Sequence, residues 1–410
     1  MSTEKELGMR IAIVAGPYVP VPPKGYGGAE LVIHYLIKGL RAAGHEPVLL
    51  ATGDSTEDCE LIPIVPKALS FAKSSKDYAT FAKQVADAQK VTEQKLRELL
   101  PRIDIIHSHG FDLKNFADFP NLTTIHNEIV FHDDNDSRNL AYYLQRTNLN
   151  YVSVSQNLQA SCPQLHYIDA IYNGEDPALF PLVRKPEDYV CFLGRFDRKK
   201  NPHLAIELAL EYGIKIKVAG KVDHEGEEYF EHHIAKYLDH PLVEYLGEIG
   251  FDEKVELLSH AKCNLHPTNF REPFGLTVLE AAYCGTPTLA IARGSMPELI
   301  EFGRTGVWVE DFVEGYHHLE ECFAMDRAYI ASRAKQLFNY RAMAKQYIRA
   351  YRTVLSEMAM PANASAKQRF TNLINDLQPR LPLPLTPTTA RLNLGLGRAK
   401  ASSSLRHMWR

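Results

Sequence analysis

Basic side chains that could hold a diphosphate lie in one short stretch of the chain. It reads Gly194-Arg195-Phe196-Asp197-Arg198-Lys199-Lys200-Asn201 and directly follows a short apolar segment, residues 190–193. Arg195 offers a planar fork of donors to phosphate oxygens, and Lys200 offers a point charge. A run of basic residues is more often a solvated loop than a binding site. This run, however, follows a predicted strand, where parallel α/β sheets bind ligands, so we favour the binding role.

A second stretch combines two glutamates with the expected start of a helix. It reads Glu272-Pro273-Phe274-Gly275-Leu276-Thr277-Val278-Leu279-Glu280 and follows the strand predicted over residues 264–266. A helix that begins near Phe274 has free backbone N–H groups in its first turn, and these groups and the helix dipole favour a phosphate. Carboxylates accept paired hydrogen bonds, so Glu272 and Glu280 suit sugar hydroxyls. The alternative is that both glutamates lie on a solvated face.

A glycine-rich loop in the first part of the chain could also approach an anion. Gly25-Tyr26-Gly27-Gly28-Ala29-Glu30 lies between the strand predicted over residues 10–16 and a predicted helix that ends at Gly44. Glycines in such a loop let backbone N–H groups come close to a phosphate. The spacing differs from G-x-G-x-x-G, which disfavours dinucleotide binding. A plain tight turn is the alternative interpretation.

Three histidines follow two other predicted strands. His107 and His109 lie at the end of the strand predicted over residues 103–107, and His126 follows the strand predicted over 122–125. Residues two apart on a strand point to the same face. Histidine clusters can bind metals, but no cysteine or nearby acid completes a ligand set, so we expect no metal. At least one of His107 and His109 is expected to be structural.

Short apolar segments alternate with helical patterns along most of the chain, in two series. This alternation predicts an α/β fold with two Rossmann-like domains that face a cleft, each with a parallel sheet covered by helices. The expected helices include residues 77–100, 202–212, 252–261, 274–284 and 341–358. The expected strands are 10–16, 47–51, 103–107, 122–125, 151–154 and 168–172 in the first series, and 190–193, 216–219, 243–246, 264–266 and 288–290 in the second.

Four segments follow from these patterns. We expect an N-terminal domain over residues 1–172, a C-terminal domain over 173–340, a helix over 341–358 and a tail over 359–410. The tail after residue 360 holds eight basic residues and one acidic residue, and Pro379, Pro382, Pro384 and Pro387 break any helix there. We expect it to be disordered, and weak contact with anionic lipid is the alternative.

Composition narrows the class of protein. The chain has 410 residues and a net charge of −4, so we expect no nucleic-acid partner. Its six cysteines form no C-x-x-C pair, which fits a reducing compartment. The N-terminus lacks signal-peptide features, and no apolar run approaches the length of about 18 residues that spans a bilayer. We expect a cytoplasmic protein, with peripheral membrane contact left open.

Taken together, the stretches above resemble the retaining family 4 glycosyltransferases with the GT-B fold. Residues 272–280 are similar to the E-x₇-E signature of that family, and Gly194-Arg195 with Lys200 is similar to its diphosphate-binding pair. Gly27-Gly28-Ala29-Glu30 resembles its N-terminal glycine-rich loop, and Ile106-His107-Ser108-His109 resembles its histidine-bearing strand end. The resemblance implies that helix 341–358 crosses back to the first domain.

The resemblance also implies a role for each matching residue. Arg195 and Lys200 would hold the diphosphate of a sugar donor, and Glu280 would bind the ribose hydroxyls. Glu272 and the amides of Phe274, Gly275 and Leu276 would hold the donor sugar and its phosphates.

The resemblance implies roles for the first domain too. Gly27 and Gly28 would approach the phosphates from that domain. His109 would lie by the reacting sugar, and His107 and His126 are further candidates on the acceptor side.

The implied reaction transfers a sugar from a nucleoside diphosphate, UDP or GDP, to an acceptor hydroxyl with retention of anomeric configuration. No metal or other cofactor is expected, because Arg195, Lys200 and a helix terminus can stabilise the departing diphosphate. Lipid, polysaccharide and small-molecule acceptors stay open. A nucleotide-sugar epimerase of related fold and a non-catalytic nucleotide-sugar-binding protein are the alternatives.

Overall fold

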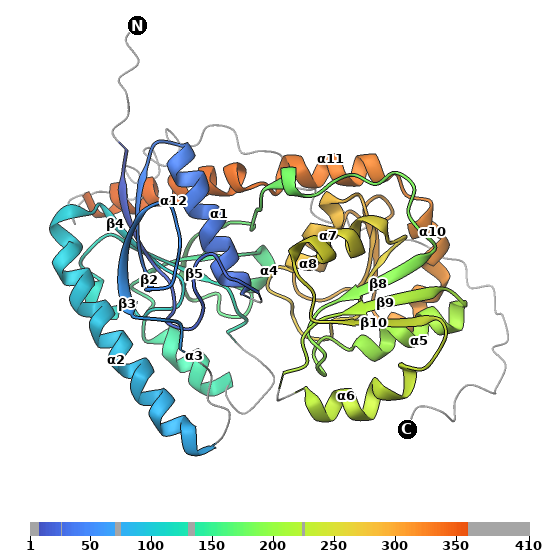
Figure 1. The fold of residues 1–410 in the computed structure, drawn as a ribbon. Helices are drawn as coiled ribbons and strands as arrows, with labels where there is room; N and C mark the ends of the chain where they lie inside the picture. The colour runs from blue at the N-terminus through green and yellow to red at the C-terminus, as the bar shows by residue number, and fades with distance from the viewer. Residues whose placement is uncertain (1–7, 26, 70–74, 130–135, 224–225, 360–410) are drawn as a thin grey trace, which may run out of the picture.

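The computed structural model describes residues 8–25, 27–69, 75–129, 136–223 and 226–359. Within these residues the chain forms two parallel sheets with helices on their faces, one sheet in each half (Figure 1). This confirms the predicted α/β architecture of two Rossmann-like domains. The tail beyond residue 359 lies outside the described residues, and so does Tyr26 of the glycine-rich loop.

The first sheet has seven strands, and its order reverses beside β1. Ile13 of β1 pairs with Leu49 on one side and with His107 on the other, so the loops after β1 and β4 leave the sheet at neighbouring points. The strands in spatial order are β3 (Glu60–Val65), β2 (Glu46–Thr52), β1 (Arg10–Val14), β4 (Ile105–Ser108), β5 (Asn121–Ile125), β6 (Asn150–Ser153) and β7 (His166–Ala170).

The second sheet repeats this order with six strands. The reversal now lies between β8 and β11, where the loops that carry Lys200 and Glu272 begin. Open α/β sheets bind ligands at such a switch point. The strands in spatial order are β10 (Val243–Gly247), β9 (Lys215–Ala219), β8 (Tyr189–Leu193), β11 (Asn264–His266), β12 (Thr288–Ile291) and β13 (Gly306–Val309).

Local sequence signals set the ends of several helices. The helix that follows the basic loop begins at Pro202, where a fixed φ suits the first helical position, and ends before Gly213 in the left-handed region. In chain order the helices are α1 (Gly28–Ala42), α2 (Ser75–Leu99), α3 (Asp136–Leu144), α4 (Gln156–Gln159), α5 (Pro202–Tyr212), α6 (Glu227–His233), α7 (Phe251–His260), α8 (Leu276–Tyr283), α9 (Met296–Leu299), α10 (Leu319–Phe323), α11 (Arg327–Leu337) and α12 (Tyr340–Ala359).

Helix α12 returns to the first domain and packs on α1 (Figure 1). Its buried residues, including Tyr347 and Tyr351, join the core beneath the first sheet. Gly39 of α1 permits this contact, because a Cβ there would lie 2.5 Å from the Cβ of Ala344. The predicted crossing helix is therefore confirmed. The domain boundaries at residues 172 and 340 stay a prediction.

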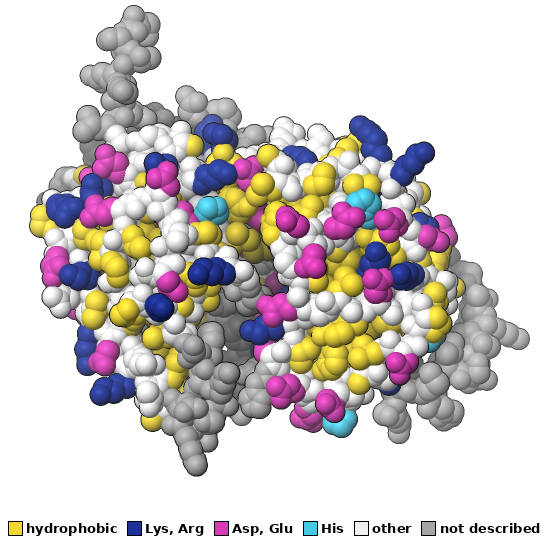
Figure 2. Space-filling model, viewed as in Figure 1, with side chains coloured by type: hydrophobic (Ala, Val, Ile, Leu, Met, Phe, Trp, Pro, Cys, Tyr) yellow, Lys and Arg dark blue, Asp and Glu magenta, His cyan; other side chains and the backbone are white. Residues whose placement is uncertain are grey.

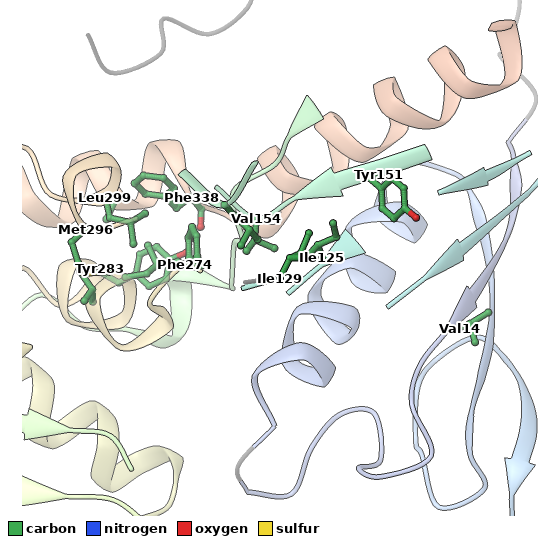
Figure 3. Packing of buried hydrophobic residues seen from close by; sticks show 14 of the residues in the cluster. Val14, Ile125, Ile129, Tyr151, Val154, Phe274, Tyr283, Met296, Leu299 and Phe338 are labelled. Atoms are coloured by element: carbon green, nitrogen blue, oxygen red, sulfur yellow. The ribbon is translucent and has the colours of Figure 1, made fainter. Parts of the chain in front are cut away.

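An apolar cluster also joins the two domains. Figure 3 shows Val154, from the end of β6, near Phe274 at the start of the α8 loop, and both belong to one buried cluster. Phe338 and Met296 extend this cluster on the C-terminal side. The domains therefore meet through packed side chains as well as through the chain crossings.

The structure differs from the sequence prediction in several elements. Strands β3 and β13 were not predicted, and neither were the helices α3, α4, α6, α9, α10 and α11. Pro63 in β3 argues against a strand in the sequence, because proline has no N–H to donate to a neighbouring strand. The structure places β3 at the edge of the sheet, where the missing N–H is tolerated. Helix α8 begins at Leu276, two residues later than expected, because Gly275 has φ 95°. No helix in the described part of the chain is long and apolar enough to span a membrane.

Candidate active site

The two loops at the switch point of the second sheet meet through an ion pair. Lys200, from the loop after β8, binds the carboxylate of Glu272, from the loop after β11. Both side chains are mostly buried, at 16% and 13% exposed. The backbone N–H of Lys200 donates to Asp197 Oδ1 at 2.8 Å, which folds the loop back on itself. The structure thus brings together two of the residues that the sequence singled out, 72 positions apart.

Arg195 lies at the base of the same loop and faces two aspartates. Its Nη2 lies 3.2 Å from Asp197 Oδ2, and its Nη1 lies 3.5 Å from Asp223 Oδ2. The charge of Arg195 also lowers the pKa of Glu272. Arg195, Lys200 and Glu272 therefore form one electrostatic group. No sequence signal pointed to Asp223, which follows β9.

Burial and charge act in opposite directions on Glu272. Burial raises the pKa of Glu272, but Lys200, His266 and Arg195 together outweigh it and hold that pKa below its ordinary value. His266, at the end of β11, has its Nε2 3.8 Å from Glu272 Oε2. Burial lowers the pKa of His266 to about 4. At neutral pH the site therefore contains an ionised Glu272 beside a neutral imidazole that sequence reasoning had not selected.

The loop that carries Glu272 is held by the segment after β12. The backbone N–H of Ser295 donates to Glu272 O at 3.0 Å, and Ser295 Oγ donates to Phe274 O at 2.5 Å. Gly294 has φ 60°, and a Cβ there would lie 2.3 Å from Glu272 O. This contact explains why a glycine stands at position 294.

The start of α8 faces the glycine-rich loop of the other domain. A Cβ on Gly28, the first residue of α1, would lie 3.5 Å from Leu276 Cδ1. Gly27 precedes α1 in extended backbone, and a Cβ there would lie 2.8 Å from Pro23 Cβ. The first residues of α1 and α8, which belong to different halves of the chain, therefore lie close together.

Glu280 lies inside the protein in the second turn of α8. Its side chain is 3% exposed and binds the ammonium group of Lys254 on α7. Burial raises the pKa of Glu280, while Lys254 opposes this effect. Lys254 had no signal in the sequence beyond its place on a predicted helix.

The three histidines divide into one structural residue and one pair. His107 is fully buried, and its Nδ1 and Nε2 lie 2.7 Å from Tyr351 Oη and 2.7 Å from Thr124 Oγ1. His109 Nδ1 lies 2.8 Å from His126 Nε2, while its own Nε2 has no partner among the described residues.

Burial keeps these imidazoles uncharged. It lowers the pKa of His107 to about 3 and that of His126 to about 4, and it holds the pKa of His109 well below its ordinary value. His107 and His109 do share one face, with ring centroids 4.2 Å apart. Both nitrogens of His107 have partners, whereas the Nε2 of His109 is buried and has none among the described residues.

The two domains also touch beside this site. Arg271 Nε lies 3.8 Å from Glu128 Oε1 of the first domain. These two residues line a small crevice with Asn157, Leu158, Ser161, Glu272 and Pro273. Figure 2 shows the surface indented between the domains, with acidic and basic side chains along its border.

Glu298 on α9 makes a further contact across the domain boundary. Its two carboxylate oxygens accept hydrogen bonds from the backbone N–H groups of Gln156 and Asn157 in α4, at 2.8 and 2.7 Å. Tyr172 Oη donates to the same carboxylate at 2.9 Å. One side chain of the C-terminal half therefore anchors a helix start of the N-terminal half.

Known proteins with similar sequences are glycosyltransferases. The chain is 24% identical to an uncharacterized glycosyltransferase of Methanocaldococcus jannaschii, over 85% of this chain and all of that protein. It is 25% identical to the glycogen synthase of Mycobacterium tuberculosis, over 92% of this chain and 98% of that protein.

Solved structures share the fold. The sucrose-phosphate synthase of Thermosynechococcus elongatus has a TM-score of 0.70 and 20% identity, covering 85% of this chain and all of that one. HepE of Anabaena, solved with UDP and glucose, has a TM-score of 0.62 and 17% identity, covering 83% of this chain and 98% of that one.

Each half of the chain matches its own family model. Residues 26–178 match the Glycosyltransferase Family 4 model, and residues 180–319 match the model for glycosyl transferases group 1. The first match covers the strands of the first sheet from β2 to β7, and the second covers every strand of the second sheet. With this fold and these two matches, the chain is a glycosyltransferase of the GT-B class.

Proposed function

We propose that this enzyme moves a sugar from a nucleoside diphosphate to an acceptor hydroxyl and retains the anomeric configuration. One observation carries the proposal: the ammonium of Lys200 meets the carboxylate of Glu272 beside Arg195, at the switch point of the second sheet. Cations there can take the diphosphate, and a carboxylate next to them can accept hydrogen bonds from a sugar hydroxyl.

The donor would lie along the facing helix starts. Arg195 and Lys200 hold its diphosphate, and the amides of Phe274, Gly275 and Leu276 bind the phosphates and sugar together with Glu272. From the other domain, Gly27 and Gly28 approach the phosphates; a Cβ on Gly28 would already contact Leu276. Glu280, buried and oriented by Lys254, accepts hydrogen bonds from the ribose hydroxyls.

The chemical step breaks the bond between the anomeric carbon and the phosphate oxygen. The acceptor oxygen forms its bond to the same face of that carbon, and its proton passes to the departing phosphate. Negative charge grows on the diphosphate, where Arg195 and Lys200 stabilise it without a metal ion. His109 lies by the reacting sugar, with the free Nε2 as its donor or acceptor, and His126 fixes the orientation of that ring through Nδ1.

The donor is proposed to carry UDP or GDP. A solved HepE structure of Anabaena contains UDP-glucose, which supports a uridine nucleotide. The acceptor would be chosen by the first domain, whose loops after β4 and β5 border the site. Lipid, polysaccharide and small molecules all stay candidates for the acceptor.

The proposal is tested by a thermal-shift screen of UDP- and GDP-sugars, followed by product analysis with the best ligand. A ligand that binds only the folded state raises its apparent stability by about 2.7 kcal/mol at 100 times its dissociation constant. We expect stabilisation by one nucleotide sugar, and an α-linked product from an α-linked donor by NMR. An altered sugar without any acceptor would instead support the epimerase, and inversion at the anomeric carbon would contradict the proposed mechanism.

A further inference from the structure

Glu175 is a buried carboxylate that the proposed reaction does not use. It is 1% exposed, and neither of its carboxylate oxygens has a hydrogen-bond partner among the described residues. Buried polar groups are almost always hydrogen-bonded, and an unpaired buried charge is costly. This side chain therefore needs an explanation.

The backbone of Glu175 is firmly held at the point where the chain crosses between the domains. Its N–H donates to Tyr283 Oη of α8 at 3.1 Å, and its carbonyl accepts from the N–H of Tyr340 at 2.9 Å. Tyr340 is the first residue of α12, which returns to the first domain. Glu175 thus lies where both crossings and α8 come together.

Two buried carboxylates, Glu175 and Glu280, lie within the electrostatic reach of one ammonium group, that of Lys254. The charge of Glu280 raises the pKa of Glu175, on top of the larger effect of burial, while Lys254 opposes both. Burial alone would lower the pKa of Lys254, but the charges of Glu280 and Glu175 together help to raise it above its ordinary value. Three other titratable groups lie near Glu175 and Glu280, namely Tyr283 of α8, Tyr35 of α1 and Cys284 at the end of α8. Burial raises the pKa of each, so all three stay uncharged while Glu175 and Glu280 compete for Lys254.

The charge balance decides which group keeps a proton. One ammonium cannot compensate two buried carboxylates, and like charges in a dry site do not both ionise. Glu280 makes the direct ion pair with Lys254, whereas Glu175 has no described partner. The proton therefore stays on Glu175, and Lys254 stays with Glu280.

We propose that Glu175 is a positioning residue for nucleotide binding: by carrying a proton it leaves Lys254 to Glu280, which keeps the Glu280 carboxylate oriented toward the ribose. This inference rests on the proposed role of Glu280. When Glu175 loses its proton at higher pH, the new charge competes for Lys254 and repels Glu280, so the affinity for a nucleotide falls. Inorganic pyrophosphate, which has no ribose, is not affected.

The test compares UDP and pyrophosphate binding by calorimetry in wild type and Glu175→Gln. Glutamine has the shape of the protonated carboxyl and no charge at any pH. For the wild type we expect UDP affinity to fall across a pH series as the pH rises through the raised pKa of Glu175, by about tenfold for each pKa unit of coupling between Glu175 and the bound nucleotide. For Glu175→Gln we expect a flat profile, and pyrophosphate should show no difference between the two proteins.

Asp176→Asn is the matched control. Asp176 is the next residue of the same segment, but its Oδ2 binds Lys38 Nζ at 2.7 Å, on α1. We expect this variant to keep the wild-type pH profile. A profile that is equally steep in Glu175→Gln and in wild type would overturn the inference.

Two further measurements separate this inference from the proposed function. Glu280→Gln should weaken UDP but not pyrophosphate; if UDP binding is unchanged, the ribose role of Glu280 is wrong and the inference falls with it. Independently of any ligand, neutral Glu175 contributes stability that is lost as pH rises through its raised pKa. Thermal denaturation should therefore lose this pH dependence in Glu175→Gln, and an unchanged dependence would place the proton elsewhere.

Discussion

At the scale of single residues, two ion pairs organise the site. Lys200 is paired with Glu272, and Lys254 is paired with Glu280. Lys200, which is proposed to act on the diphosphate, is thus compensated by a carboxylate proposed to bind a sugar hydroxyl, while Lys254 orients Glu280. A diphosphate would compete with Glu272 for Lys200, so the affinity for phosphate and the rate of transfer can respond differently to one substitution.

The substitution Lys200→Ala tests the leaving-group role. Turnover should fall about 100- to 1000-fold, the usual cost of removing one donor that stabilises a developing negative charge. The measurement is kcat with a confirmed donor. Lys199→Ala, a change at the exposed neighbouring lysine, should stay near wild type. Equal losses in the two variants would contradict a specific role for Lys200.

The substitution Glu272→Ala should separate binding from turnover. It removes the carboxylate that now compensates Lys200, so the affinity for pyrophosphate should stay equal or rise, while transfer is lost. Calorimetry with pyrophosphate and an activity assay check the two halves. If the protein instead melts at a much lower temperature with its pyrophosphate affinity lost, Glu272 is chiefly structural.

At the scale of elements, the site depends on the loops after β8, β11 and β12, which meet near the start of α8. The loop after β12 supports the loop after β11, through Ser295 and the close approach of Gly294 to Glu272. Position 294 has φ 60°, which favours glycine, and it also has no room for a side chain. These two requirements can be separated.

The substitution Gly294→Ala should impair activity more than backbone strain explains. Its control is Gly213→Ala, at φ 82° with no atom within 4 Å of the added Cβ. Both variants should lose about 1–2 kcal/mol of unfolding free energy through the left-handed backbone. Only Gly294→Ala should also displace Glu272 and reduce kcat. Denaturant unfolding and kinetics measure the two effects, and full activity in Gly294→Ala would show that the loop adapts.

At the scale of the whole molecule, the two domains are joined by an apolar cluster, by the two chain crossings and by polar contacts at the rim. The contact of Glu298 with the start of α4 places a negative charge at free backbone N–H groups, which the local dipoles favour. Because α12 packs on α1, separation of the domains requires movement about the crossings near Glu175 and Tyr340.

The substitution Glu298→Gln should loosen the domain contact. We expect the free energy of unfolding to fall by about 1 kcal/mol, because a charged acceptor at the backbone N–H groups of α4 is replaced by a neutral one. Small-angle scattering should show a larger radius of gyration. Glu301→Gln is the control, because Glu301 binds Arg304 and Arg333 within its own domain. An equal change of radius in both variants would contradict the role of Glu298.

The sequence by itself determined the alternating architecture and the places where the site begins. Strand 264–266 and helix 202–212 have the predicted bounds, because buried parallel strands and capped helices carry local signals. Tertiary structure alone decided the partners: Lys254 for Glu280 and Tyr351 for His107, while the carboxylate of Glu175 has none in the described part of the chain. The physical reason is distance along the chain, since His107 and Tyr351 are 244 residues apart and no local pattern encodes which side chains meet across two domains.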